Sequence, residues 1–296
     1  DIAQQISQGD LERTIHLDKP SELARLAAAF NKMKTDIKKH LMELARISGE
    51  KEKIESELAI AHTIQLSALP TDFPKKEAFE LVASMTPARE VGGDFYDFFP
   101  VDDTHFAIVM ADVSGKGITA ALYMMSAKAM IKNMLQAGYP LVEALSKANK
   151  GLCDNHSRGM FVTAFVGILD IKTGQIEYVS AGHCPPLQKT NDVYDYIAVV
   201  RNMFLGVSPN YQYESGKFTL KNNDRLFLYT DGVTEAQTKK ETLFEQERLK
   251  KALNEKQMSL TDTIANVRKH IQRFVKGAPQ SDDITMMVLE FHKKQK

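Results

Sequence analysis

Four acidic positions of this 296-residue chain lie at the ends of apolar runs that have the character of buried strands. They are Asp94, Asp112, Asp231 and the pair Asp282-Asp283. If these runs belong to one domain, the carboxylates meet at a sheet rim, where they repel unless some are protonated or a cation neutralises them. Ligation by oxygen alone suits hard divalent cations such as Mg²⁺, Mn²⁺ or Ca²⁺. The pattern therefore predicts a metal centre.

A second interpretation stays open, because Asp and Gly also mark ordinary turns. For any one position a turn is the more common explanation, whereas four such positions in one domain favour a metal centre; spacing alone leaves the two about equal. The eight histidines lack the spacing of a zinc site. Cys153 and Cys184 form no CxxC pair, which predicts packing roles and a reducing, cytoplasmic setting.

The composition limits the class of protein. Lysine plus arginine and aspartate plus glutamate number 38 each, so the formal net charge is zero and we expect no nucleic-acid partner. At ~150 residues per domain the length suggests about two domains. No apolar run approaches the ~18 residues that cross a bilayer. The chain begins in mid-pattern at Asp1, so we expect a fragment whose membrane anchor lies upstream of residue 1.

The first predicted element is one long helix that begins near Ser21, a candidate N-cap, and ends before Pro70. Apolar residues recur along it in steps of three and four, as one buried stripe requires. They are Leu23, Leu26, Phe30, Met33, Ile37, Leu41, Leu44, Ile47, Ile54, Leu58 and Ala61. A single helix packed on its own domain would show the same stripe, but the flanking Lys and Glu residues favour a parallel coiled-coil homodimer.

The pattern changes after Pro70, where strands dominate. Strands are predicted near 80–86, 95–101, 105–112, 161–169, 175–180, 193–200, 217–220, 224–230 and 284–291. Helices are predicted near 118–137, 140–155, 242–256 and 260–275. Grouped strands with helices in pairs predict an α+β domain with antiparallel sheets.

Five ordered motifs carry a family resemblance. They are Val91-Gly-Gly-Asp-Phe-Tyr-Asp97, Ala111-Asp-Val-Ser-Gly-Lys-Gly117, Ser180-Ala-Gly-His-Cys-Pro-Pro186, Tyr229-Thr-Asp-Gly-Val-Thr-Glu235 and Ser281-Asp-Asp-Ile-Thr285. Together they resemble the bacterial SpoIIE/RsbU-like branch of the PPM (type 2C) metal-dependent protein phosphatases. The resemblance covers roughly residues 57–291, and it includes a lead-in helix that contains Gln65.

A second resemblance covers residues 1–45. Gly9-Asp-Leu11 and the segment 21–33 resemble the connector and second helix of a HAMP signalling module, with departures at Ser21 and Ala24. We therefore divide the chain into a partial HAMP module at 1–45, a coiled-coil signalling linker at 46–70 and a phosphatase domain at 71–296. HAMP modules usually follow a transmembrane helix, so the resemblance implies the cytoplasmic region of a bacterial inner-membrane receptor.

The phosphatase resemblance implies a four-layer αββα sandwich, with antiparallel sheets flanked by helices and two Mn²⁺ or Mg²⁺ ions at one end. Asp94 and Asp112 match metal-holding positions, with Asp112 as the bridging ligand. The carbonyl of Val113 matches a backbone ligand. Asp231 and Asp282 match the remaining carboxylates. Two such ions activate a water for in-line attack on phosphorus.

Five further positions are candidates around these ligands. Asp283 is assigned to support the ligands, and Gly93 and Gly232 would let the backbone approach closely. Arg89 is a candidate for gripping phosphate through its fork, with an exposed surface arginine as the equal alternative. His183 is a candidate proton donor, although a histidine that organises its loop is the favoured interpretation.

We thus expect a signalling serine/threonine phosphoprotein phosphatase. By resemblance, its substrate is a phosphorylated STAS-type anti-sigma-factor antagonist or a similar regulator, and an N-terminal HAMP and coiled-coil dimer controls it. Two alternatives stay open. One is a catalytically silent scaffold that binds such a partner, which the complete acidic set disfavours. The other is a metal phosphohydrolase, such as a phosphodiesterase, that acts on small molecules.

Overall fold

The computed structural model describes residues 14–16, 22–154 and 159–293. The chain forms two compact units that divide between Ile60 and Ala61. The predicted N-cap at Ser21 and the motif Gly9-Asp-Leu11 lie outside the described residues.

The first unit consists mainly of the helix α2, which runs from Glu22 to Ala68 and contributes its last two turns to the second unit. The predicted long helix is confirmed. An extended segment is fastened to it, since the Ile15 amide donates to Asn31 Oδ1 at 3.0 Å and Asn31 Nδ2 donates to the Ile15 carbonyl at 2.8 Å. The predicted apolar stripe is solvent-exposed in the single chain, for example at Leu26, Leu41 and Leu44. Within the described residues, no helix combines the length and hydropathy needed to cross a membrane.

The second unit contains two sheets. The first has the order β1-β11-β10-β6-β7 and the second has the order β2-β3-β4-β5-β8, with β9 also paired to β5. The bounds of the first sheet are β1 Phe79–Thr86, β6 Leu187–Thr190, β7 Val193–Tyr196, β10 Arg225–Tyr229 and β11 Ile284–Phe291. Those of the second are β2 Phe95–Pro100, β3 His105–Val113, β4 Val162–Asp170, β5 Gln175–Ala181, β8 Arg201–Asn202 and β9 Gly216–Thr219.

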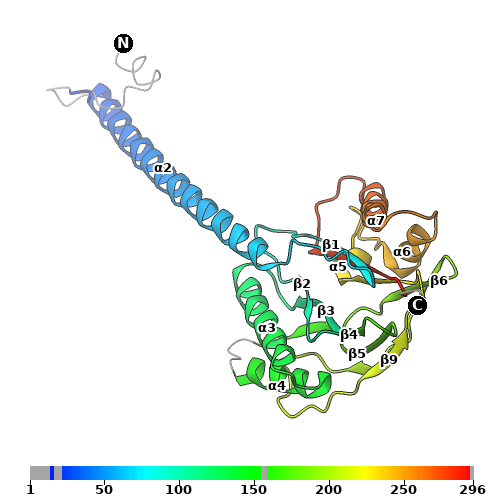
Figure 1. Cartoon of the computed structure of the whole chain (residues 1–296). Coiled ribbons are helices and arrows are strands. Elements are labelled where there is room, and N and C mark those ends of the chain that lie inside the picture. Colours follow the sequence, from blue (N-terminus) through cyan, green and yellow to red (C-terminus); the bar gives the residue numbers. More distant parts are fainter. Residues whose placement is uncertain (1–13, 17–21, 155–158, 294–296) are drawn as a thin grey trace. The chain divides into compact units, whose positions relative to one another are not determined.

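Helices cover the outer face of each sheet, which confirms the αββα sandwich and the α+β class. The pair α3 (Ile118–Gln136) and α4 (Leu141–Asp154) packs on the second sheet, and α6 (Glu245–Leu253) and α7 (Leu260–Val275) pack on the first (Figure 1). One apolar cluster lies between the sheets and under α3 and α4, with Phe79, Phe165 and Leu289 fully buried in it. A second cluster lies under α6 and α7.

The structure departs from the predicted elements in short or irregular segments. β6, β8 and the single turn α5 (Asp231–Thr234) were not predicted, and the predicted strand 193–200 ends at Tyr196. The sheets are also not purely antiparallel, because β5 and β8 pair in parallel. These elements have two to four residues, too few to show a periodic pattern.

Asp97 of β2 is a buried charge that connects the second sheet to α3. Lys128 of α3 pairs with its carboxylate, and Lys132 lies 3.6 Å from the same oxygen. The Asp97 side chain is 2% exposed. Removing one partner of an ion pair this deeply buried strongly destabilises a protein. The pair therefore fixes the position of α3 on the sheet, and α3 directly follows the motif 111–117.

Candidate metal centre

The four predicted acidic positions meet because of strand register. Asp94 immediately precedes β2, and Asp112 lies at the end of the neighbouring strand β3, where Phe95 pairs with Ala111. In the other sheet, Asp231 lies two residues after the end of β10 and Asp282 lies two residues before the start of β11. Because each pair of strands runs antiparallel, the end of one and the start of the next lie at the same edge. The site is thus built from one edge of both sheets.

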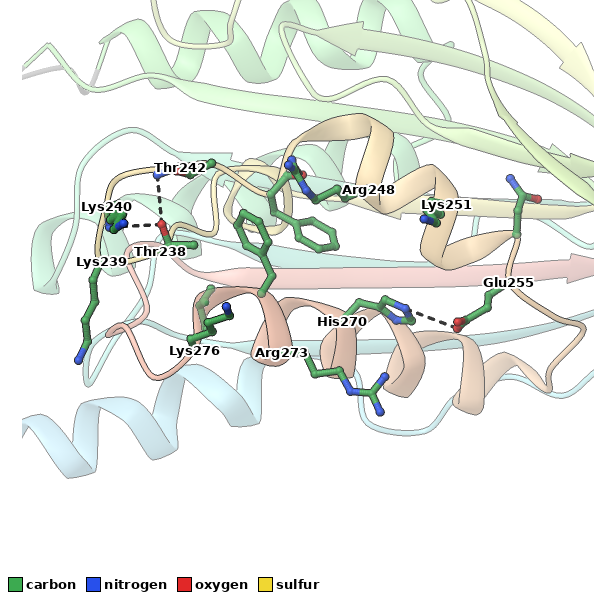
Figure 2. Close-up of a pocket in the computed structure, with 14 residues that line it drawn as sticks. Thr238, Lys239, Lys240, Thr242, Arg248, Lys251, Glu255, His270, Arg273 and Lys276 are labelled. Carbon is green, nitrogen blue, oxygen red and sulfur yellow. Dashed lines mark hydrogen bonds and ion pairs between the residues drawn. The ribbon is translucent and has the colours of Figure 1, made fainter.

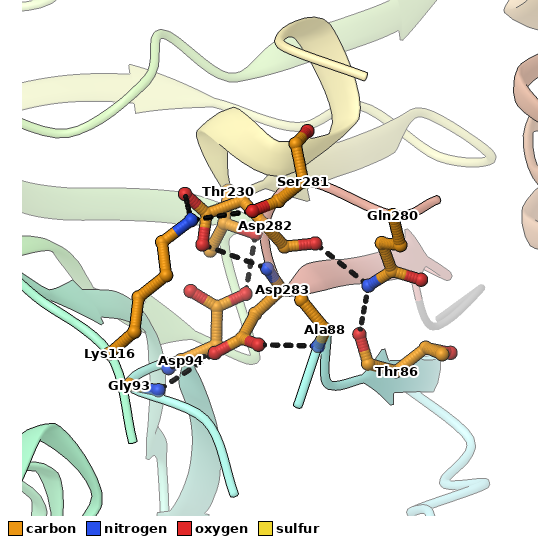
Figure 3. Close-up of polar contacts among 10 residues, drawn as sticks. All are labelled: Thr86, Ala88, Gly93, Asp94, Lys116, Thr230, Gln280, Ser281, Asp282 and Asp283. Atoms are coloured by element: carbon orange, nitrogen blue, oxygen red, sulfur yellow. Dashed lines mark hydrogen bonds and ion pairs between the residues drawn. The ribbon is translucent and has the colours of Figure 1, made fainter. Parts of the chain in front are cut away.

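Asp94 is the most deeply buried carboxylate of the site, at 1% exposure. Its Oδ2 accepts a hydrogen bond from the hydroxyl of Thr230 at 2.7 Å (Figure 3). The same oxygen accepts a second hydrogen bond from the hydroxyl of Thr285 at 2.5 Å. Burial raises its pKa well above the ordinary value, with the charges of Asp112 and Asp283 adding to the rise and the two hydroxyls opposing it. The carboxylate is therefore held in one orientation and gains from a nearby positive charge.

The pKa values of Asp112 and Asp231 are also raised, by burial first and by neighbouring carboxylates second. Burial, followed by the charges of Asp231 and Asp282, raises the pKa of Asp112 to about 8. Burial, followed by Glu235 and Asp282, raises the pKa of Asp231 to about 6. Raised carboxyl pKa values mean that these groups are poorly neutralised by the protein itself. A divalent cation bound by their oxygens would offset the repulsion between these carboxylates. Carboxylate oxygens are the ligands that such cations prefer.

Asp282 already has a cationic partner. Lys116, from the loop before α3, places its Nζ 2.8 Å from Asp282 Oδ2 and donates to the Ser281 carbonyl at 2.5 Å (Figure 3). Gln280 braces the same segment, since its Nε2 donates to the carbonyls of Thr86 at 2.8 Å and Asp282 at 2.7 Å. The turn that holds Asp282 is therefore fixed from both sheets.

Asp283 lies at the site but faces the backbone. Its carboxylate accepts from the amides of Ala88 at 2.8 Å, Gly93 at 2.7 Å and Asp94 at 3.4 Å. The residue is buried, so its oxygens serve to shape the loop 88–94 that carries Asp94. Its role in supporting the metal ligands stays a prediction.

The glycines around the site permit close approaches of backbone to backbone. A Cβ on Gly93 would lie 2.8 Å from the Val113 carbonyl oxygen, and a Cβ on Gly232 would overlap the Asp283 carbonyl. Gly92 is equally restricted by the Asp283 carboxylate. The predicted backbone ligand Val113 thus lies directly beside the loop of Asp94.

The acidic side chains lie near one another but do not surround a common position at which an ion could bind. Among the residues that the structure describes, no three His, Cys, Asp or Glu side chains already form an arrangement that would hold one ion. The oxygen donors are of the right kind, and their raised pKa values favour a cation. Binding a cation would require these side chains to move. In the structure described here, Lys116 neutralises the charge of Asp282.

The remaining candidates lie at different depths. Arg89 is exposed. The backbone amide of the preceding residue, Ala88, donates to the Asp283 carboxylate. His183 is buried, and its Nδ1 lies 2.9 Å from the hydroxyl of Thr163, which pairs with Asp112 across β3 and β4. Burial lowers the pKa of His183 to about 4, so the imidazole is neutral at pH 7 and its position fits a loop-organising residue.

Three groups that contact the site were not predicted from the sequence. These are the hydroxyls of Thr230 and Thr285 and the side chain of Gln65, which binds the backbone of Gly92. Both threonines lie within the sequence motifs that contain predicted ligands, Thr230 directly before Asp231 and Thr285 three residues after Asp282. A hydroxyl side chain in such a motif was therefore the available signal. Nothing in the local pattern connects Gln65 with Gly92.

Comparison with known proteins identifies the family of the chain. The family model for stage II sporulation protein E (SpoIIE) matches residues 102–292, and the HAMP domain model matches residues 1–39. Phosphoserine phosphatase RsbU of Bacillus subtilis is 32% identical over 247 residues, which cover 82% of this chain and 72% of RsbU. Protein IcfG of Synechocystis is 26% identical over 317 residues, which cover 97% of this chain but 49% of IcfG.

A solved structure supports the fold independently. The SiaA-PP2C domain of Pseudomonas aeruginosa matches with a TM-score of 0.71 at 21% identity, over 82% of this chain and 98% of that domain. At this identity the likeness concerns the fold. The sandwich described above is thus the PP2C fold, with the carboxylates at one edge of its two sheets.

Proposed function

Because the chain belongs to the SpoIIE family of PP2C-type serine/threonine protein phosphatases, we propose that it dephosphorylates a phosphoserine or phosphothreonine of a signalling protein. The observation that carries this proposal is the gathering of Asp94, Asp112, Asp231 and Asp282 at one edge of both sheets, with the pKa values of three of them raised. A catalytically silent scaffold would have no reason to retain such a set of mutually repelling carboxylates.

The proposed site would hold two Mn²⁺ or Mg²⁺ ions through Asp94, Asp112, the Val113 carbonyl, Asp231 and Asp282. Bound there, the ions would supply Lewis acidity toward water and toward the phosphoryl oxygens. The chain's own part is positional. The hydroxyls of Thr230 and Thr285 fix the Asp94 carboxylate, and Asp283 fixes the backbone of the loop that carries it.

We propose a phosphorylated STAS-type anti-sigma-factor antagonist, or a similar small regulator, as the substrate. The support is the 32% identity with a phosphoserine phosphatase and the HAMP match at residues 1–39. A small-molecule phosphohydrolase is the competing activity, and it is distinguished by comparing a phosphoserine protein with nucleotide phosphates.

Control of the enzyme is proposed to run through a parallel homodimer. We assign residues 1–45 to the HAMP module, 46–70 to the coiled-coil linker and 71–296 to the phosphatase domain. The exposed apolar stripe of α2 supports a second helix as its partner, since Leu23, Leu26 and Leu44 are each more than half exposed in the single chain. The HAMP match supports the cytoplasmic region of an inner-membrane receptor as the setting.

The test is phosphate release from a chromogenic phosphate monoester and a phosphoserine peptide, with Mn²⁺ and with a chelator. We expect Mn²⁺-dependent turnover that is lost in Asp231→Ala and retained in Asp103→Asn, a change at an exposed aspartate away from the site. Absence of turnover by folded protein shown to bind Mn²⁺, in both the whole chain and residues 57–296, would favour the scaffold.

A further inference from the structure

A concave surface whose lining includes none of the four carboxylates lies between α6, α7 and the turn 238–242. Its volume is about 1160 Å³. Figure 2 shows the two helices on opposite sides of it, with labelled lysine and arginine side chains around the opening. We call this surface the α6–α7 groove.

The lining of the α6–α7 groove is strongly cationic. Six of its lining residues are lysine or arginine and one is a carboxylate, Glu255, which already lies 3.5 Å from His270. The cations are Lys239, Lys240, Arg248, Lys251, Arg273 and Lys276, and all six are exposed. The chain as a whole has no net charge, so this is a local concentration of positive charge.

The floor of the groove is formed by two aromatic side chains. Phe244 is 2% exposed and meets the ring of Phe274 edge to face at 5.4 Å between centroids. The Arg248 guanidinium lies 4.9 Å over the Phe274 ring and donates to the carbonyls of Leu243 and Phe244. The groove therefore offers an aromatic base under a charged rim, a combination that suits an amphipathic acidic peptide segment.

The groove is close to the carboxylate edge. Val275 lines both the groove and a smaller cavity of about 200 Å³. That cavity is also lined by Gly232 and Ser281, the chain neighbours of Asp231 and Asp282. In addition, the Phe244 amide donates to the Ala236 carbonyl at 2.8 Å. This bond joins the segment that follows α5 to a residue that lines the groove. A bound segment would thus lie on the same side of the sandwich as the reacting phosphate.

We propose that the α6–α7 groove docks an acidic amphipathic segment of the phosphoprotein substrate while its phosphoserine occupies the carboxylate site. This rests on the proposed function. A membrane surface is flat and would not fill a groove between two helices, and a nucleic acid would need a cationic track longer than this one depression. The occupant is therefore a protein segment whose acidic side chains meet the rim and whose apolar side chains meet Phe274.

The probes are two synthetic peptides with the same phosphoserine core. One has flanking Glu and Leu residues in an amphipathic helical pattern, and the other has Gln at every Glu position. In the whole chain with Mn²⁺, we expect kcat/KM to be about tenfold higher for the acidic peptide, as several rim charges of modest individual strength would give. The preference falls in high salt because exposed charges are screened.

The groove variant is Lys239→Glu/Lys240→Glu/Arg273→Glu. We expect the acidic-to-neutral ratio of kcat/KM to fall to near one in this variant. The matched control is Lys150→Glu/Lys172→Glu/Lys221→Glu, which reverses three exposed lysines that do not line the groove. The control keeps the preference, and thermal unfolding verifies that both variants fold. Equal preference in wild type and groove variant would overturn the proposal, as would no acidic preference in the wild type.

Fluorescence anisotropy of the labelled peptides tests docking separately from turnover. If no phosphate ester is hydrolysed, the proposed function fails, while weaker binding of the acidic peptide to the groove variant still supports the groove. Unlabelled single-stranded DNA and anionic phospholipid vesicles serve as competitors. Displacement of the peptide by either one at lower concentrations than by unlabelled acidic peptide would overturn the assigned occupant.

Discussion

Gln65, near the end of α2, forms two hydrogen bonds with the backbone of Gly92. Its Nε2 donates to the Gly92 carbonyl at 2.6 Å, and its Oε1 accepts from the Gly92 amide at 3.0 Å. The Gln65 side chain is 3% exposed. Gly92 precedes Gly93 and Asp94, so the last turns of the helix are bonded directly to the loop that carries a predicted metal ligand.

Gln65→Leu should loosen this loop. The change leaves the buried amide and carbonyl of Gly92 without partners, which costs about 1–3 kcal/mol for each group. We expect a lower urea midpoint and weaker Mn²⁺ binding by calorimetry. Ser67→Ala, an exposed position one half-turn on, removes only a local bond to the Ile64 carbonyl and should change neither. Unchanged Mn²⁺ affinity in Gln65→Leu would show that the loop keeps its shape unaided.

Thr285→Val should weaken Mn²⁺ binding by about tenfold, because a hydrogen bond to a charged acceptor is worth roughly 1.5–3 kcal/mol. The variant keeps the side-chain shape and removes the hydroxyl that bonds Asp94 Oδ2 at 2.5 Å. Thr285→Ser restores a hydroxyl and serves as the matched control. Isothermal titration with Mn²⁺ measures both, and equal affinity in the Val and Ser variants would contradict the role assigned to this hydroxyl.

The stability of the chelated protein should fall as pH rises from about 4 to about 8. The pKa of Asp112 is raised from 3.8 to about 8 in the folded state, so between these values the folded state binds more protons than the unfolded state. Unfolding free energy then decreases with increasing pH. Urea unfolding in EDTA at several pH values measures the slope.

Asp112→Asn should reduce this slope, since the amide does not titrate, and Asp103→Asn should leave it unchanged. Asp94 and Asp231 also have raised pKa values, so part of the slope remains. Adding Mn²⁺ should stabilise the wild-type protein more at pH 8 than at pH 5. Stability that rises steadily from pH 4 to pH 8 in EDTA would refute the assignment.

Gly232→Ala should destabilise the phosphatase unit by about 2 kcal/mol or more and abolish turnover. The added methyl group would overlap the Asp283 carbonyl, and relief requires moving Asp231 or Asp282. Gly49→Ala is the contrasting change, because nothing lies near its Cβ in the middle of α2, and it should be neutral or stabilising. Circular-dichroism melting and a phosphate-release assay test the pair; a Gly232→Ala variant with normal melting would refute the close approach.

The sequence predicted those parts of the molecule that depend on local periodicity. The long helix α2 and the strands β3, β4 and β11 have enough alternating or apolar residues to be recognised. β8 and α5 were not predicted because two to four residues show no period. The convergence of the acidic positions followed from their places at strand ends.

Contacts between distant segments were beyond the pattern. The hydrogen bond from Thr285 to Asp94 joins residues 191 positions apart. The hydrogen bond from Gln65 to Gly92 joins the helix α2 to the loop between β1 and β2. Such pairs depend on how two sheets stack, which no window of sequence records. The α6–α7 groove was likewise not predicted, because its cations come from a turn and two helices.

The carboxylates come in equal parts from the two layers, Asp94 and Asp112 from one sheet and Asp231 and Asp282 from the other. A cation shared among them would cross-link the two sheets. Loading the site would then slow the sliding and separation of the layers, and proteases that need such openings would cut the loaded protein more slowly. Resistance to digestion would become a gauge of metal occupancy that needs no substrate.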